Sequence, residues 1–245
     1  MRFKEKTVIV TGAASGIGLA TAKRFGSGGA RVVIADLNLA KAQSAADEVK
    51  RAGAEDAAGM ACDVAEEEQV ISVVRQTLDK FQGLHVVVNN AGLMIFKPLA
   101  EQTCEDWRRV LNVDLLGSFY FIKQAFQHMP RGGAVVNVSS IHAIETTPLV
   151  SAYAAAKAAV VSLTRSTALE GAAKGIRVNA VLPGAVDTPM LWNNPNVKSG
   201  LEQIERGVLG KPEDLASVIA FLASDEAEFV RGAAVVVDGG RLGKL

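Results

Sequence analysis

The sequence has little of what several classes of protein require. It holds two cysteines in 245 residues, Cys62 and Cys104, without metal-ligand spacing, so we expect free, reduced thiols and no disulfide. Lysine plus arginine equal aspartate plus glutamate at 26 each, and the absence of a long basic run argues against a nucleic-acid partner. No apolar stretch reaches about 18 residues, and the N-terminus lacks a signal-peptide core. We therefore expect a cytoplasmic protein with no membrane partner.

What is present fits one α/β domain. Hydrophobic residues make up 49% of the chain and charged residues 21%, which argues against disorder. Short apolar runs alternate with helical patterns, and no repeat or low-complexity linker marks a boundary. Such runs predict a parallel sheet covered by helices on both faces, with right-handed crossovers. The expected strands lie at 7–11, 31–36, 57–62, 85–89, 134–139, 176–182 and 233–237.

The segment from Thr7 to Gly18 carries the most informative pattern. An apolar, β-branched run ends in Gly12, Gly16 and Gly18, and a helix-forming stretch follows. A strand, a tight turn and a helix N-terminus in succession gather unpaired N–H groups and the positive end of a helix dipole around one point, which suits a phosphate. We expect Gly12 to permit the turn, Gly16 to admit a pyrophosphate and Gly18 to let the helix pack on the sheet. The spacing is G-x3-G-x-G, not the commoner G-x-G-x-x-G.

An acidic residue follows the second apolar run at a distance that suits a dinucleotide site. Asp36 comes 18 residues after Gly18, so its carboxylate can accept hydrogen bonds from the adenine ribose hydroxyls. The same carboxylate would repel a 2′-phosphate, and neither Ser15 nor Leu37 is a cation that would bind one. The sequence therefore favours NAD over NADP. The alternative is that Asp36 merely ends a strand.

A tyrosine and a lysine stand close together after the fifth strand. Tyr153 follows Ser140 by thirteen residues, and Lys157 comes four residues later. On a helix that begins near Ser151 the two side chains share a face, so the ammonium can approach the phenol oxygen. Lowering a tyrosine pKa by ~3 units needs ~4 kcal/mol of preferential phenolate stabilisation, which a partly desolvated lysine can supply with the help of an oxidised nicotinamide ring. The pair predicts a general base; the alternative is an amphipathic helix with a surface lysine.

These motifs match a known family along essentially the whole chain. The chain resembles the short-chain dehydrogenase/reductase family, in its single-domain branch of about 250 residues. The resemblance implies a Rossmann-like, doubly wound parallel sheet of about seven strands in one NAD(P)-binding domain over 1–245, with no departure at a motif position. The matching residues are Thr11-Gly12-x3-Gly16-Ile17-Gly18, Asp63-Val64, Asn89-Asn90-Ala91-Gly92, Asn112-Val113, Ser140, Tyr153-x3-Lys157, Pro183-Gly184 with Thr188, and Asp238-Gly239.

The resemblance assigns catalytic roles to four residues. Tyr153 would act as general acid/base on the substrate oxygen, and Lys157 would lower the pKa of Tyr153 and bind the nicotinamide ribose. Ser140 would stabilise the same oxygen; Ser139 is its rival, but the thirteen-residue gap to Tyr153 favours Ser140. Asn112 would hold a helix bend and a water that connects Lys157 to solvent. From the residues alone, Asn112 could equally be a core amide.

The resemblance also gives the cofactor contacts, which lie after successive strands. No metal is expected, and Glu66, Glu67 and Glu68 are interpreted as solvated charge at a helix N-terminus. The expected NAD-binding residues are Gly12, Ser15, Gly16, Ile17, Gly18, Asp36, Leu37, Asp63, Val64, Asn90, Ala91, Gly92, Tyr153, Lys157, Pro183, Gly184, Val186 and Thr188.

The substrate is less well defined by the sequence. We expect Met94, His142, Thr146 and Trp192 to contact it, with Leu93, Ile144, Leu149 and Ala185 as further family positions. His142 would bind a substrate hydroxyl or support its own loop. The stretch of about 184–210 is expected to be a substrate lid, or else a disordered loop.

Three functions follow, in order of preference. The first is NAD-dependent oxidation of a secondary alcohol, such as a sugar, polyol or cyclic alcohol, in preference to a steroid or an acyl-carrier thioester. The second is reduction of a ketone or 3-oxoacyl group by the same fold. The third, a non-catalytic dinucleotide sensor, is disfavoured by the intact Ser140, Tyr153 and Lys157. A homotetramer is expected, assembled through helices near 102–129 and 151–174 and the C-terminal strand.

Overall fold

The computed structural model describes residues 2–200 and 209–244, and a seven-stranded parallel sheet forms its centre. The strand order is β3-β2-β1-β4-β5-β6-β7, so the sheet grows from β1 in both directions and reverses between β1 and β4. This confirms the expected doubly wound, Rossmann-like sheet, and every expected strand boundary is within one residue of the observed one. The strands are β1 (Thr7–Thr11), β2 (Arg31–Asp36), β3 (Asp56–Ala61), β4 (Val86–Asn89), β5 (Ala134–Val138), β6 (Arg177–Pro183) and β7 (Ala234–Val237).

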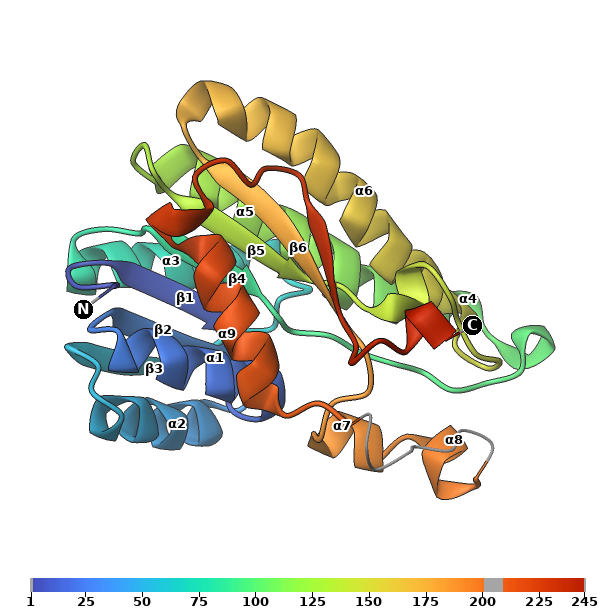
Figure 1. Ribbon diagram of the computed structural model, residues 1–245. Helices are drawn as coiled ribbons and strands as arrows, with labels where there is room; N and C mark the ends of the chain where they lie inside the picture. The colour runs from blue at the N-terminus through green and yellow to red at the C-terminus, as the bar shows by residue number, and fades with distance from the viewer. Residues whose placement is uncertain (1, 201–208, 245) are drawn as a thin grey trace.

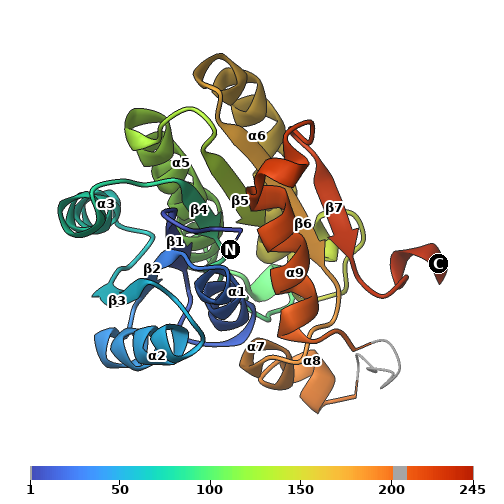
Figure 2. The same ribbon diagram turned by 60° about the vertical axis from the view of Figure 1, so that its left-hand side comes forward.

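Helices cover both faces of the sheet (Figure 2). One face carries α1 (Gly16–Ser27), α2 (Leu39–Arg51) and α9 (Pro212–Ala223), and the other carries α3 (Glu67–Phe81), α5 (Gly117–His128) and α6 (Ser151–Lys174). A short helix, α4 (Cys104–Leu111), leads into α5 through a π-helical turn, Asn112–Leu116. None of the helices in the described ranges combines the length and apolar character needed to cross a bilayer. Short 3₁₀ turns lie at Leu99–Glu101, Ile141–Ala143, Asp225–Ala227 and Leu242–Lys244.

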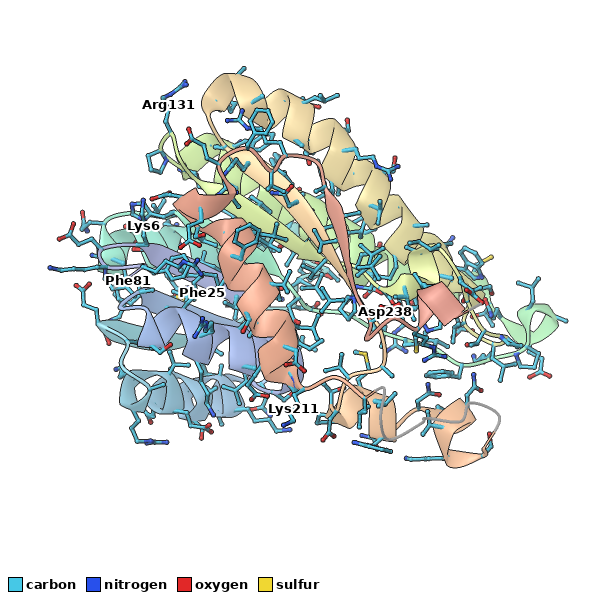
Figure 3. All side chains as sticks on the ribbon, in the orientation of Figure 1. Lys6, Phe25, Phe81, Arg131, Lys211 and Asp238 are labelled. Carbon is cyan, nitrogen blue, oxygen red and sulfur yellow. The ribbon has the colours of Figure 1, made fainter. Side chains whose placement is uncertain are left out.

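The strands divide their side chains between two apolar cores. Val8 and Val10 belong to the core beneath α1, α2 and α9, whereas Ile9 belongs to the core beneath α3, α5 and α6. This alternation follows from the two-residue period of a strand. In the first core, Phe25, which is labelled in Figure 3, packs edge-on against Phe3 with ring centroids 4.7 Å apart. Because both faces are covered, the strands read as continuous apolar runs.

The segment beyond β6 extends past the carboxyl ends of the strands (Figure 1). It forms two one-turn helices, α7 (Pro189–Trp192) and α8 (Pro195–Lys198), each with proline at its first position. Thr188 and Asn194 cap them with side-chain oxygens that accept backbone N–H groups. The part of the expected lid at 201–208 lies outside the described residues.

Candidate active site

A cleft of about 380 Å³ runs along the carboxyl ends of the strands. Its walls come from the loops after β1 to β6, the start of α1, one face of α6 and the first turn of the C-terminal tail. With the exception of Gly18, every residue expected to bind the cofactor lines this cleft. The polar residues that follow separate strands in the sequence are thus gathered at one edge of the sheet.

The glycine turn has the shape that its spacing predicts. Gly12 and Gly16 have φ of +59° and +55°, a region that glycine adopts without strain. A Cβ on Gly18 would lie 2.5 Å from the Gly12 carbonyl oxygen, so Gly18 packs behind the turn and does not face the cleft. Ser15, at the N-cap of α1, makes no side-chain capping bond. The first-turn N–H groups therefore remain available at a cradle that fits a pyrophosphate.

Two side chains fix this turn. Asn90 Nδ2 donates to the carbonyl oxygens of Thr11 (2.9 Å) and Gly12 (3.1 Å). Asp36 Oδ2 accepts the backbone N–H of Ala14 at 3.1 Å, which holds this carboxylate beside the turn. Asp36 and Asp63 are the charged residues in the β1-to-β3 part of the described cleft wall.

Ser140, Tyr153 and Lys157 meet in the middle of the cleft. Tyr153 and Lys157 lie one turn apart on α6 and are 7% and 3% exposed. Lys157 Nζ donates to the Val138 carbonyl oxygen at 3.1 Å and lies 5.4 Å from the Tyr153 ring centroid. Burial and the Asp114 carboxylate raise the pKa of Tyr153, while a hydrogen bond with Ser140 lowers it. The three side chains can therefore act on one substrate oxygen.

The two neighbouring serines have different partners. Ser139 Oγ donates to the Lys157 carbonyl oxygen at 2.7 Å, so it ties α6 to the end of β5. Ser140 caps the following 3₁₀ turn, accepting the His142 N–H at 3.2 Å, and its hydroxyl also interacts with Tyr153. This division supports the choice of Ser140 over Ser139.

Asn112 lies at the start of the π-helical turn, where the resemblance implies a helix bend, and it is not among the residues that line the cleft. Asn112 is exposed at the start of the π-helical turn, whereas Asp114 is buried against Lys157. Side chains two positions apart on a helix point about 200° apart, so the two residues face opposite directions. A π turn inserts an extra residue and changes which side chain faces the neighbouring helix.

The expected substrate residues divide into two groups. Met94 and His142 line the cleft, as does Ala185. The His142 ring packs edge-on against Tyr153, with centroids 5.7 Å apart, so it borders the catalytic group.

The other expected substrate residues are not among those that line the cleft. Thr146 is 3.0 Å from His142 Nδ1, so it supports the histidine and does not reach the cleft. Trp192 Nε1 donates to Asp187 Oδ1 at 2.6 Å, and Trp192 is not among the lining residues. Leu93, Ile144 and Leu149 are also absent from the lining.

Several lining residues were not predicted from the sequence, among them Cys62, Val138, Ile141 and Arg241. Arg241 reaches the wall because the chain turns sharply after β7. Asp238, labelled in Figure 3, accepts the backbone N–H groups of Gly240 (2.8 Å) and Leu242 (2.7 Å). The Asp238-Gly239 motif was the available signal for this turn, but not for the direction of the tail beyond it.

The sequence matches known oxidoreductases over nearly its full length. A family model described as enoyl-(acyl carrier protein) reductase matches residues 12–241. A cis-4-hydroxycyclohexanecarboxylate dehydrogenase of Sinomonas cyclohexanicum is 44% identical over 97% of this chain and 97% of the relative. A 3beta-hydroxysteroid dehydrogenase of Eggerthella lenta is 40% identical, over 97% and 94%. A 3-oxoacyl-(acyl-carrier-protein) reductase of Thermotoga maritima is 39% identical, over 98% and 99%.

Solved structures share the same fold. A dehydrogenase/reductase from Sinorhizobium meliloti superposes with a TM-score of 0.91 at 35% identity, covering 97% of this chain and 95% of the other. A short chain dehydrogenase from Burkholderia cenocepacia, in complex with NADP, superposes with a TM-score of 0.90 at 31% identity, covering 98% of each chain.

Proposed function

The chain belongs to the short-chain dehydrogenase/reductase family, whose fold binds a nicotinamide dinucleotide, and from this we propose that it oxidises a secondary alcohol with NAD. The observation that carries the proposal is the burial of Tyr153 and Lys157 on one face of α6, with Ser140 beside them. The substrate would be a sugar, polyol or cyclic alcohol. The reaction transfers a hydride between the alcohol carbon and the cofactor.

In the proposed mechanism, the protein handles the proton. Tyr153 Oη accepts the hydroxyl proton as the alcohol becomes a carbonyl, and returns it in the reverse direction. The Lys157 ammonium favours the phenolate form of Tyr153, and Ser140 donates to the substrate oxygen as negative charge develops there. The glycine turn and Asp36 would hold the pyrophosphate and adenine ribose. The bound nicotinamide supplies the hydride acceptor or donor.

The proposed preference for NAD over NADP rests on the carboxylate of Asp36. This carboxylate lines the part of the cleft that would hold the adenine ribose, so it would repel a 2′-phosphate bound there, and Asp63 adds no compensating positive charge. The Burkholderia cenocepacia structure holds NADP, so membership of the family alone leaves the choice between the two cofactors open. The proposal therefore depends on this carboxylate.

A cyclic alcohol is the favoured substrate within the proposal. The relative with 44% identity acts on a hydroxycyclohexanecarboxylate by its name, and the cleft of this chain contains Arg241 among mainly neutral side chains. Reduction of a ketone or 3-oxoacyl group is the alternative, which the name of the Thermotoga maritima relative supports. We also propose a homotetramer that works in the cytoplasm.

The test follows absorbance at the reduced-nicotinamide band. NAD or NADP is offered with cyclic alcohols, with and without a carboxylate, and with polyols, sugars and a 3β-hydroxysteroid. We expect NAD reduction with a cyclic alcohol, and a loss of at least ~100-fold in kcat for Tyr153→Phe, because removal of a general base costs about that much. Tyr120→Phe is the matched control, since Tyr120 lies on α5 outside the cleft wall.

Each outcome decides between the candidate functions. NADH consumption with ketones and no reaction with alcohols would replace the proposal by the reductase. Turnover of the steroid alone would contradict the stated substrate class. Full activity of Tyr153→Phe would refute the mechanism.

A further inference from the structure

A buried carboxylate faces the catalytic lysine. Asp114 is 1% exposed, and its Oδ1 accepts the backbone N–H of Leu93 at 2.7 Å. Its Oδ2 is buried, has no hydrogen-bond partner within the described residues, and lies 3.9 Å from Lys157 Nζ. A buried charge is unfavourable unless a countercharge stands nearby. The Lys157 ammonium is therefore the group that stabilises this carboxylate.

The charges around Asp114 come from α6. Lys157 stabilises the Asp114 carboxylate, and this carboxylate in turn raises the pKa of Tyr153. The loop after β4 contributes a backbone N–H from Leu93. On α4, the acid Asp106 is already paired with Lys97 at 2.7 Å. Asp114, Lys157 and Tyr153 thus form one coupled group among the described residues.

One ammonium cannot fully stabilise two anions. We propose that Asp114 is a positioning residue for the reaction: its carboxylate competes with the Tyr153 oxygen for the Lys157 charge and keeps the tyrosine protonated to higher pH than a neutral residue would. This inference rests on the proposed function, in which Tyr153 exchanges the proton. In this arrangement the Asp114 carboxylate opposes formation of the Tyr153 phenolate, whereas the Lys157 ammonium favours it.

The ionisation of the group supports this assignment. Burial raises the pKa of Asp114 to about 6, although Lys157 and the Leu93 N–H act in the opposite direction. Asp114 is therefore predominantly a carboxylate at and above neutral pH, where its charge raises the pKa of Tyr153. A protonated tyrosine can give its proton to a carbonyl, whereas alcohol oxidation needs the phenolate. Asp114 thus moves the onset of oxidation to higher pH.

The test is the pH dependence of kcat/KM for alcohol oxidation in Asp114→Asn. Asparagine preserves the shape and the acceptor for the Leu93 N–H but removes the charge. The pKa of Tyr153 should then fall, so that phenolate forms at lower pH. We expect the acidic limb of the profile, where kcat/KM rises with pH, to shift to lower pH by about one unit. A neighbouring charge produces an effect of this size. An unmoved limb would overturn the inference.

Two further variants separate charge from structure. Asp106→Asn makes the same change at a buried acid on α4 that is paired with Lys97, and it should leave the acidic limb in place. Asp114→Glu keeps the charge and should retain the wild-type limb even if its rate falls. Equal displacement in Asp114→Asn and Asp114→Glu would show that position 114 acts only through packing. If Asp114→Asn folds poorly, Asp114→Ser supplies the same loss of charge.

A spectroscopic measurement tests the inference without turnover. The chain has two tyrosines, so in a Tyr120→Phe background the phenolate absorbance reports Tyr153 alone. Adding Asp114→Asn should make this absorbance appear at lower pH, and an unchanged titration would contradict the inference. If Tyr153→Phe retains activity, the proposed function fails. If Tyr153→Phe is inactive but neither the limb nor the titration moves, only the role of Asp114 fails.

Discussion

At the scale of the residue, Asp36 alone carries the proposed preference for NAD. It ends β2, and its contact with the Ala14 N–H fixes it beside the glycine turn. Two like charges about 4 Å apart near a protein surface repel by about 1 to 4 kcal/mol, and about 1.4 kcal/mol is a tenfold ratio. We expect Asp36→Asn to lower the ratio of kcat/KM for NAD over NADP about tenfold, as measured with one alcohol and both cofactors.

The control for this residue is Asp47→Asn. Asp47 is exposed on α2, so the variant makes the same change in net charge away from the cleft and should leave the ratio unaltered. A ratio that stays the same in Asp36→Asn would remove the basis for NAD preference.

At the scale of the element, one arginine joins β6 to the end of α9. Arg177 is 5% exposed and donates to the carbonyl oxygens of Leu222 (2.5 Å), Ser224 (2.9 Å) and Ala227 (3.2 Å). The last carbonyls of a helix lack partners within it, so this guanidinium fixes the end of α9, which packs beside α1 (Figure 2). We expect Arg177→Met to lower the free energy of unfolding by about 3 kcal/mol in urea titrations, because buried acceptors would lose a charged donor.

A second arginine provides the comparison. Arg75 is exposed on α3, and Arg75→Met should change stability by no more than about 0.5 kcal/mol. Similar urea midpoints for the two variants would show that Arg177 contributes nothing particular to the end of α9.

At the scale of the whole molecule, exposed apolar side chains lie on the helices expected to join subunits. Leu169 on α6 is 79% exposed and Phe119 on α5 is 40% exposed. If these faces meet in a homotetramer, a buried charge there would be strongly unfavourable. We expect wild-type protein to scatter light as a tetramer and Leu169→Glu to have a smaller mass. Leu39→Glu, at a 45% exposed leucine on α2, should remain tetrameric, and a monomeric wild type would contradict the assembly.

The sequence by itself determined the local features of this protein. The sheet followed from buried apolar runs, which encode a strand within a few residues. The tight turn at Gly12 and Gly16 followed from the spacing of the glycines. Tyr153 and Lys157 were predicted to share a face because residues four apart on a helix always do. Each of these depends on neighbours along the chain.

Only the tertiary structure decided which groups from different elements meet. A π-helical turn directed Asp114, and not Asn112, toward Lys157. The turn at Asp238 brought Arg241 to the cleft from the far end of the chain. These contacts depend on how separate elements pack against one another. The period of a helix and the spacing of a motif describe only neighbours along the chain, so they do not predict this packing.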